Sequence, residues 1–284
     1  MKPLFFTFLL LSILSCKSQE NLPDIVSNLE KVSTQVGDDT RTYSIFIPST
    51  ITEGMPASGA VFLFHGSNGS GEQLSASTNM NSELEQENLI GVYPDAPIGN
   101  WAEDCSCNNA DRLQINDTSF VRIMLDEIME SYTFSTDRVF AIGFSQGGLF
   151  AQRLACQMSD SFTAFGVVAA NMSVPLAQKC DPQTPVSQII VQGRLDTVLP
   201  YNGSNNGALS LVPTQQTLRF WAEQNECNLS NALVETDPEK ELLSYCSEEL
   251  SAQLTLVTSQ NGGHGWFLPG VQTNKELISF FQQF

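Results

Sequence analysis

Short apolar runs and stretches of helical periodicity follow one another along this chain, and their order predicts strands that alternate with helices. The apolar runs are rich in β-branched and aromatic residues, which favours strands. Between them, apolar residues recur every three or four positions, as on one face of a helix. The predicted strands are 42–47, 60–64, 89–93, 140–144, 165–169, 188–191 and 253–257, and the predicted helices are 117–129, 147–158, 213–225 and 273–283.

This alternation is typical of an α/β fold in which helices cover both faces of a doubly wound, mostly parallel sheet. Continuous apolar runs such as 60–64 indicate strands buried on both sides. The run 42–47 alternates apolar and polar residues, so we expect it at an edge of the sheet. We expect Asp117 to cap the helix that follows it. The length and the absence of internal repeats favour a single main domain.

One turn between a predicted strand and a predicted helix carries the pattern Gly143-Phe144-Ser145-Gln146-Gly147. A Gly-x-Ser-x-Gly sequence in this setting is typical of a nucleophile elbow, in which the glycines allow a turn so sharp that the serine stands exposed. Ser145 is therefore the candidate nucleophile for attack on a carbonyl.

A serine hydroxyl needs a neighbouring base, and this chain contains only two histidines, His65 and His264. His65 ends an apolar run upstream of the serine. His264 lies late in the chain, in the glycine-rich segment Asn261-Gly-Gly-His-Gly-Trp266, as the order of residues in serine hydrolases of this type requires. We expect His264 to be the base and His65 to support its own loop.

The third member of a triad would be a carboxylate that orients the histidine. Asp196 follows the predicted strand 188–191 and its closing Gly193, on the kind of loop where such a carboxylate is expected. Asp181 is the competing candidate, although it precedes that strand. An aspartate that only caps the turn is the structural alternative for Asp196.

Further motifs accompany these residues: His65-Gly66, Tyr93-Pro-Asp95, Trp101, Arg138 before the elbow, and Gly262-Gly-His264-Gly-Trp266. Together they resemble secreted α/β-hydrolases of the polyhydroxybutyrate depolymerase and feruloyl esterase group, over most of the chain beyond its amino end. The resemblance implies the α/β-hydrolase fold and a Ser145, Asp196 and His264 triad. The family usually reads His-x-Trp-Pro-Gly at the last motif, whereas here Phe267 and Leu268 intervene. This departure affects the rim beside the histidine.

In such a fold, two backbone N–H groups hold the oxyanion that forms during acyl transfer. We expect one donor from Gln146, directly after the nucleophile, and the other from the loop at Gly66 and Ser67. A glycine-rich surface turn is the structural alternative for that loop. It lacks a phosphate-binding Gly-x-x-x-x-Gly-Lys pattern.

Two tryptophans are candidates for apolar walls around a bound acyl group. Trp266 lies two residues after the expected base, and Trp101 lies in a predicted loop. Aromatic faces supply large contact areas in binding sites. Both residues could equally be ordinary half-buried tryptophans.

The amino end predicts export. Residues 1–15 carry one early lysine and a short apolar core, as in a signal peptide. The run up to Cys16 resembles a bacterial lipobox, so we expect Cys16 to carry a lipid and residues 16–35 to form a tether. Residues 36–284 would then form the catalytic domain of a periplasmic or outer-membrane lipoprotein. Simple secretion with Cys16 unused is the alternative.

The six remaining cysteines are an even number, and export permits disulfides. Sequence alone allows fifteen pairings. Proximity along the chain and the family resemblance suggest Cys156 with Cys180 and Cys227 with Cys246, which leaves Cys105 with Cys107. With so few histidines and no second close cysteine pair, we expect no metal and no cofactor.

The formal charge of −18 and the absence of a basic run argue against nucleic acid as a partner. We expect a serine carboxylesterase that acts on feruloyl- or acetyl-type esters of polysaccharide or on short polyhydroxyalkanoate oligomers. A serine peptidase with the same triad, and polyhydroxybutyrate depolymerase as the main activity, are the alternatives. A binding protein on an inactive scaffold would have lost the triad.

Overall fold

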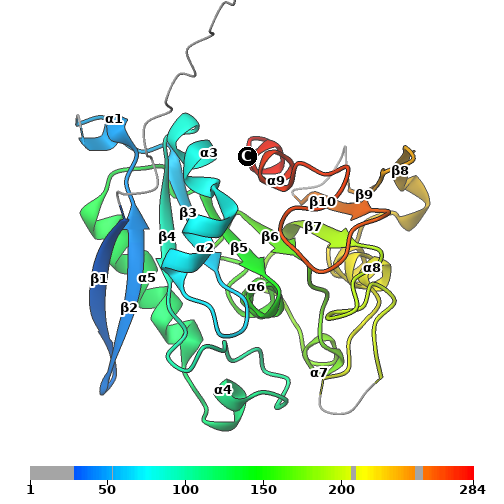
Figure 1. The fold of residues 1–284 in the computed structure, drawn as a ribbon, viewed down its shortest axis with the longest axis horizontal. Coiled ribbons are helices and arrows are strands. Elements are labelled where there is room, and N and C mark those ends of the chain that lie inside the picture. Colours follow the sequence, from blue (N-terminus) through cyan, green and yellow to red (C-terminus); the bar gives the residue numbers. More distant parts are fainter. Residues whose placement is uncertain (1–28, 53, 206–208, 247–251) are drawn as a thin grey trace, which may run out of the picture.

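A ten-stranded sheet in the order β1-β2-β4-β3-β5-β6-β7-β10-β9-β8 forms the centre of the molecule. The structure is a computed structural model that describes residues 29–52, 54–205, 209–246 and 252–284. Strands from β4 to β10 along this order are parallel, whereas the strands at both edges pair antiparallel. Figure 1 shows β1 and β2 at one edge and β8 at the other.

The strands are β1 Leu29–Val36, β2 Asp39–Phe46, β3 Gly59–Phe64, β4 Leu89–Pro94, β5 Val139–Phe144, β6 Ala164–Val168, β7 Ser187–Gly193, β8 Leu233–Thr236, β9 Lys240–Tyr245 and β10 Leu254–Ser259. The helices are α1 Ser49–Thr52, α2 Gly71–Thr78, α3 Met80–Gln86, α4 Asn109–Arg112, α5 Asp117–Ser131, α6 Gln146–Gln157, α7 Val174–Ala177, α8 Thr214–Gln224 and α9 Thr273–Phe281. The predicted alternation of strands and helices is confirmed.

Two hydrophobic cores lie on opposite faces of this sheet. Successive residues of β3 point alternately into the two cores. Phe62 and Phe64 lie in one core, and Val61 and Leu63 lie in the other. This separation follows from the two-residue period of a strand. Residues of α5, α6 and α8 complete the first core, and residues of α2, α3 and α9 complete the second. The doubly wound arrangement expected from the apolar runs is therefore present.

The edges of the sheet differ from expectation. The segment 42–47 belongs to β2, which is not an edge strand because β1 pairs with it along its whole length. Residues 29–35, which we expected in the tether, form most of β1, so the sheet starts before residue 36. The sequence signal was weak because β1 is mostly exposed and lacks an apolar run. Strands β8 and β9 were missed for the same reason. Residues 1–28, including Cys16, lie outside the described residues.

All three expected disulfides are present: Cys105 with Cys107, Cys156 with Cys180, and Cys227 with Cys246. The second joins the end of α6 to the segment after α7. The third joins the segment after α8 to the end of β9. Among the described residues, no helix is both long and apolar enough to span a bilayer.

Asp117 does not cap α5, contrary to expectation. Asn116 is the N-cap, and its side chain accepts a hydrogen bond from the Ser119 N–H. Asp117 is instead fully buried and forms an ion pair with Arg41 at 2.8 Å. Its second oxygen accepts the Ala102 N–H at 2.8 Å, so the carboxylate also holds the loop that follows β4. The burial of both charges in one pair explains why Asp117 is unavailable as a cap.

Replacement of Asp117 by alanine is predicted to lower the free energy of unfolding by about 3–5 kcal/mol, because it leaves the Arg41 guanidinium buried without its counter-charge. Urea unfolding of the two proteins measures this change. Arg219→Ala is the control, since it removes an ion pair to Glu223 in which both side chains are more than half exposed. A loss for Asp117→Ala no larger than for Arg219→Ala would contradict the prediction.

Candidate active site

Ser145 lies at the sharp turn between β5 and α6 with φ of 54°, a left-handed conformation that is rare for a serine. Its neighbours explain the two glycines of the pattern. A Cβ on Gly143 would lie 2.0 Å from the Gly147 carbonyl oxygen, and a Cβ on Gly147 would lie 2.2 Å from the Phe64 carbonyl oxygen. Only glycine fits at both positions, so the sequence pattern and this turn are directly linked.

His264 lies between the serine and an acidic residue. Its Nε2 is 2.9 Å from Ser145 Oγ, and its Nδ1 is 2.7 Å from Asp196 Oδ2. These three residues are separated by up to 119 positions in the chain. The loops after β5, β7 and β10 bring them together, because the carboxyl ends of parallel strands meet at one edge of the sheet. The histidine side chain is 18% exposed and the aspartate carboxylate is fully buried.

Four donors surround the Asp196 carboxylate. Oδ1 accepts the backbone N–H groups of Val198 and Leu199, at 2.8 and 2.9 Å. Oδ2 accepts Gln192 Nε2 at 3.1 Å as well as His264 Nδ1–H. With Oδ2 as acceptor, His264 carries its proton on Nδ1 and presents a free Nε2 lone pair to Ser145. Sequence reasoning missed Gln192, whose only signal was its position on β7 four residues before the aspartate.

The competing carboxylate, Asp181, does not take part in this arrangement. It is exposed and precedes β7, and its described hydrogen bond is made by its backbone oxygen, with Gln183. The aspartate on the loop after the strand is therefore the one that contacts the histidine.

Gln146 is held in place by its own side chain. Its Oε1 accepts the Trp101 N–H at 2.9 Å, and its Nε2 donates to the Trp101 carbonyl at 2.6 Å. As the first residue of α6, Gln146 has no helical acceptor for its backbone N–H. This group is therefore available beside Ser145, as an oxyanion donor requires.

The loop after β3 lies on the other side of the serine. A Cβ on Gly66 would lie 3.2 Å from Ser145 Cβ, and Ser67 follows on the exposed surface, where its Oγ accepts Asn100 Nδ2. His65 supports this loop, as expected: its Nε2 accepts the Ala96 N–H at 3.1 Å, and its Nδ1 lies 2.7 Å from the Gly66 carbonyl. Burial lowers the pKa of His65. The neutral ring thus fixes the loop by two hydrogen bonds.

The two tryptophans do not form walls of an open site. Trp101 is fully buried, stacks on Phe150 and donates Nε1–H to the His65 carbonyl. Trp266 is only 6% exposed, and its Nε1–H donates to Asn274 at the start of α9. Sequence reasoning could not foresee this because a tryptophan in a loop has no periodic pattern that reveals its burial.

Exposed apolar side chains adjoin the histidine and the aspartate instead. Phe267 is 62% exposed and lies on the His264 loop, and Leu195 and Val198 flank Asp196. The Leu195 N–H donates to the Gly262 carbonyl, so the two loops are joined. Phe267 is one of the two residues that depart from the family pattern, and the departure places an exposed apolar ring three residues after the histidine in the sequence.

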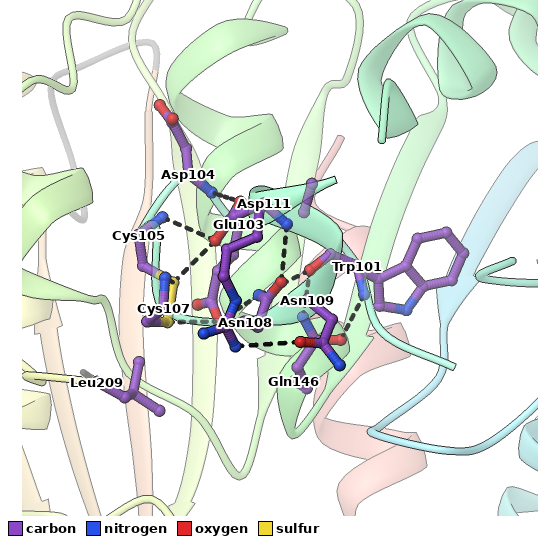
Figure 2. Close-up of a disulfide and its surroundings, with 12 residues drawn as sticks. Trp101, Glu103, Asp104, Cys105, Cys107, Asn108, Asn109, Asp111, Gln146 and Leu209 are labelled. Carbon is purple, nitrogen blue, oxygen red and sulfur yellow. Dashed lines mark hydrogen bonds between the residues drawn. A yellow bond between two sulfur atoms is a disulfide. The ribbon is translucent and has the colours of Figure 1, made fainter. Parts of the chain in front are cut away.

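Glu103 and the Cys105–Cys107 disulfide form a buried cluster on the loop that contains Trp101 (Figure 2). One oxygen of Glu103 and the two sulfurs lie within 4.8 Å of one another, which is a spacing compatible with metal ligation. A cysteine sulfur ligates a metal as a free thiolate, whereas both sulfurs are bonded to each other here. Burial raises the pKa of Glu103 to about 8, with nearby Asp111 adding to the shift.

Comparison with known proteins finds esterases among those similar to this chain. The chain is 24% identical over 235 residues to feruloyl esterase B of Piromyces equi. This match covers 79% of this chain and 42% of that protein. It is 25% identical to feruloyl esterase B of Thermothelomyces thermophilus, over 91% of this chain and 88% of that protein. A solved acetyl xylan esterase from Aspergillus awamori superimposes with a TM-score of 0.65 over 89% of this chain and 99% of that one, at 16% identity. The protein has the α/β-hydrolase fold.

The resemblance of this chain to feruloyl esterases, expected from its motifs, is confirmed by these relatives. They do not test the polyhydroxybutyrate depolymerase part of that expectation, which stays a prediction. The chain spans less than half the length of three of the curated relatives it matches. No family model matches the sequence.

Glu103 is predicted to make the folded protein less stable as pH rises from about 4.5 to about 8. In this range the unfolded chain carries an ionised Glu103, whereas the folded protein must keep the group protonated, so proton release favours unfolding. Glu103→Gln removes this effect. Urea unfolding at pH 5 and pH 8 measures the free energy of unfolding of both proteins. The value for the variant minus that for the wild type should be more positive at pH 8 than at pH 5 by about 2 kcal/mol or more. A difference independent of pH would contradict the prediction.

Proposed function

We propose that this protein is a serine carboxylesterase that works through Ser145, His264 and Asp196. The hydrogen-bond chain from Asp196 Oδ2 through the imidazole to Ser145 Oγ is the observation that carries the proposal. The esterase relatives support it independently. The proposal concerns this chain, whose motifs and contacts are described above.

In the proposed reaction, Ser145 Oγ attacks the ester carbonyl while His264 Nε2 accepts its proton. The imidazolium that forms is stabilised by Asp196, which the donors from Gln192, Val198 and Leu199 hold in position. His264 then protonates the leaving alcohol. Water attacks the acyl-enzyme by the reverse sequence and releases the acid.

The developing oxyanion would accept hydrogen bonds from the Gln146 N–H and from the loop at Gly66 and Ser67. Loss of one such donor typically lowers kcat by about a hundred-fold to a thousand-fold. The side-chain clamp between Gln146 and Trp101 supports this role, because it holds the donor in one orientation before substrate arrives. Preorganised donors stabilise charge without a reorganisation cost.

Feruloyl- or acetyl-type esters of polysaccharide are the proposed substrates, with short polyhydroxyalkanoate oligomers as the further class. The names of the relatives support the first class, since they include feruloyl and acetylxylan esterases. Phe267, which follows His264 by three residues and is exposed, supplies an apolar surface on which we propose that an aromatic acyl group stacks.

We also infer that the protein is exported and anchored through a lipid on Cys16. Three disulfides among the described residues support export, because such bonds form and persist in oxidising compartments. The signal-like residues 1–15 support it from the sequence.

Ser145→Ala is predicted to reduce hydrolysis of methyl ferulate to background while leaving the urea unfolding midpoint close to that of the wild type. The hydroxyl is the attacking group, whereas the backbone turn does not depend on it. Ser77→Ala, an exposed serine on α2, is the control and should retain full activity. The same proteins are also assayed with three further substrates: acetylated xylan, a hydroxybutyrate oligomer and the amide that matches the ferulate ester. Faster cleavage of the amide than of the ester would favour a peptidase and overturn the proposal.

Phe267→Ala is predicted to raise KM for methyl ferulate about three-fold to ten-fold, with a smaller effect on an acetyl ester. The reason is loss of ring stacking, which is typically worth about 0.5–1.5 kcal/mol. Val234→Ala on β8 is the control, because its side chain is similarly exposed, at 61%, and lies on an edge strand. Equal effects on the two esters would show that Phe267 does not distinguish acyl groups.

A further inference from the structure

The loop from Trp101 to Asn108, here called the exchange loop, contains a disulfide that closes over a single residue, Ser106. Figure 2 shows Cys105 and Cys107 beside Glu103 and Asp111, with Asn108 linking this group to Trp101 and Gln146. The mechanism of ester hydrolysis uses neither the disulfide nor the buried acid, so their arrangement needs a separate explanation.

Both sulfurs of this disulfide face carboxylate oxygens. Cys105 Sγ lies 2.9 Å from Asp111 Oδ2, and Cys107 Sγ lies 3.7 Å from Glu103 Oε1. A sulfur in a disulfide carries no hydrogen, so each contact joins two acceptors. In the dithiol form each S–H could donate to the carboxylate that already faces it. The surroundings are therefore better matched to the reduced pair than to the disulfide.

Further contacts around Cys105 and Glu103 favour thiol–disulfide exchange at this disulfide. The Cys107 N–H donates to Cys105 Sγ at 3.0 Å and would stabilise a thiolate on that atom. Glu103 is 2% exposed, and its Oε2 has no hydrogen-bond partner among the described residues. A buried carboxyl with one oxygen unpaired and no counter-charge is favoured in its neutral form, so it holds a proton next to the sulfurs.

The other two disulfides provide internal controls. In each of the three pairs one cysteine is buried and the other is partly exposed, so access to a reductant is similar. The sequence separations are 24 and 19 for Cys156–Cys180 and Cys227–Cys246, but only 2 for Cys105–Cys107. Opening the short pair disconnects no distant segments. In the described part of the chain, the other four sulfurs make no hydrogen bond.

We propose that Cys105 and Cys107 form a thiol–disulfide exchange site that a small dithiol reduces, with Glu103 as the proton donor. A thiolate of the dithiol attacks the more exposed Cys107 Sγ, the S–S bond breaks, and its electron pair leaves on Cys105 Sγ. The second thiol of the reductant loses its proton to solvent and attacks the reductant sulfur in the mixed disulfide. The bond between that sulfur and Cys107 Sγ breaks, and Cys107 leaves as a thiolate.

Proton transfer completes the exchange. Cys107 takes the proton of the Glu103 carboxyl, which is restored from water, and Cys105 is protonated from solvent and donates to Asp111. In total the dithiol loses two electrons and two protons and becomes a disulfide, and the cysteine pair gains them.

The exchange loop also reaches the ester site. Asn108 Nδ2 donates to the Trp101 carbonyl at 3.1 Å and to Glu103 Oε1 at 3.2 Å, and the same Trp101 carbonyl accepts Gln146 Nε2. Reduction changes the partner of Glu103 and therefore the hydrogen bonds that orient Gln146. This connection rests on the proposed function, in which the Gln146 N–H holds the oxyanion.

The test is differential reduction of the folded protein. Samples are incubated with increasing dithiothreitol, alkylated with a maleimide and analysed by peptide mass spectrometry. Cys105 and Cys107 are expected to be half-labelled at a reductant concentration at least ten-fold below that for the other two pairs. Labelling of Cys105 and Cys107 only together with, or after, the other pairs would overturn the proposal. This readout does not require esterase activity.

Variants test the role of the acid. Glu103→Gln keeps an acceptor for Asn108 but removes the carboxyl proton, so it should slow labelling of Cys105 and Cys107 several-fold and leave the other pairs unchanged. Asp104→Asn is the matched control in the same loop, since Asp104 is partly exposed and pairs with Lys179. Equal effects of the two variants on the labelling of Cys105 and Cys107 would show that Glu103 does not supply a proton in the exchange.

Activity is measured on the same samples. Reduction limited to Cys105 and Cys107 should lower kcat for methyl ferulate several-fold with little change in KM, because Gln146 would act only on the transition state. An unchanged kcat would overturn the connection to Gln146 and leave the exchange site standing.

Discussion

The left-handed turn at Ser145 is the constraint on which the site depends. It reverses the chain between β5 and α6 within one residue, and it is possible only because no side chain occupies positions 143 and 147. A Cβ at either position would overlap a backbone oxygen. The turn leaves the serine hydroxyl directed toward His264 and the Gln146 N–H at the start of a helix, where it has no helical acceptor. Backbone strain at this point is thus coupled directly to the proposed chemistry.

The parallel part of the sheet supplies the remaining groups. Loops after β3, β5, β7 and β10 leave the same edge, so Gly66, Ser145, Asp196 and His264 meet although they come from distant parts of the chain. Two cores on opposite faces hold these strands in register, and loop-to-loop hydrogen bonds such as Leu195 to Gly262 fix the final positions. The side chains with the proposed chemical roles therefore lie on loops that leave neighbouring packed strands, which keeps the distances between them short.

Buried polar groups join the site to the rest of the molecule. Arg41 and Asp117 hold Ala102, Trp101 holds Gln146, and Asn108 joins Trp101 to Glu103 and the short disulfide. Because charges and amides in a core must be paired, each of these contacts restricts the next one. The loop after β4 is therefore a fixed support of the turn at Ser145, and under our proposal a change in the state of the disulfide reaches Gln146, the proposed oxyanion donor, through a few hydrogen bonds.

The sequence by itself determined the inner strands and most helices, because their apolar runs and periods are local. It also led to Ser145, His264 and Asp196 as the candidate triad, since a glycine-framed serine, a chain with two histidines and one loop after a strand left few choices. Only the tertiary structure decided the edges of the sheet, where β1, β8 and β9 carry too few buried apolar residues to be recognised. The tertiary structure alone shows that Trp101 is buried in the core and that Gln192 donates a hydrogen bond to Asp196. It alone shows that Asp117 forms an ion pair with Arg41. Burial and pairing of these side chains depend on residues far away in the sequence, and no local pattern records them.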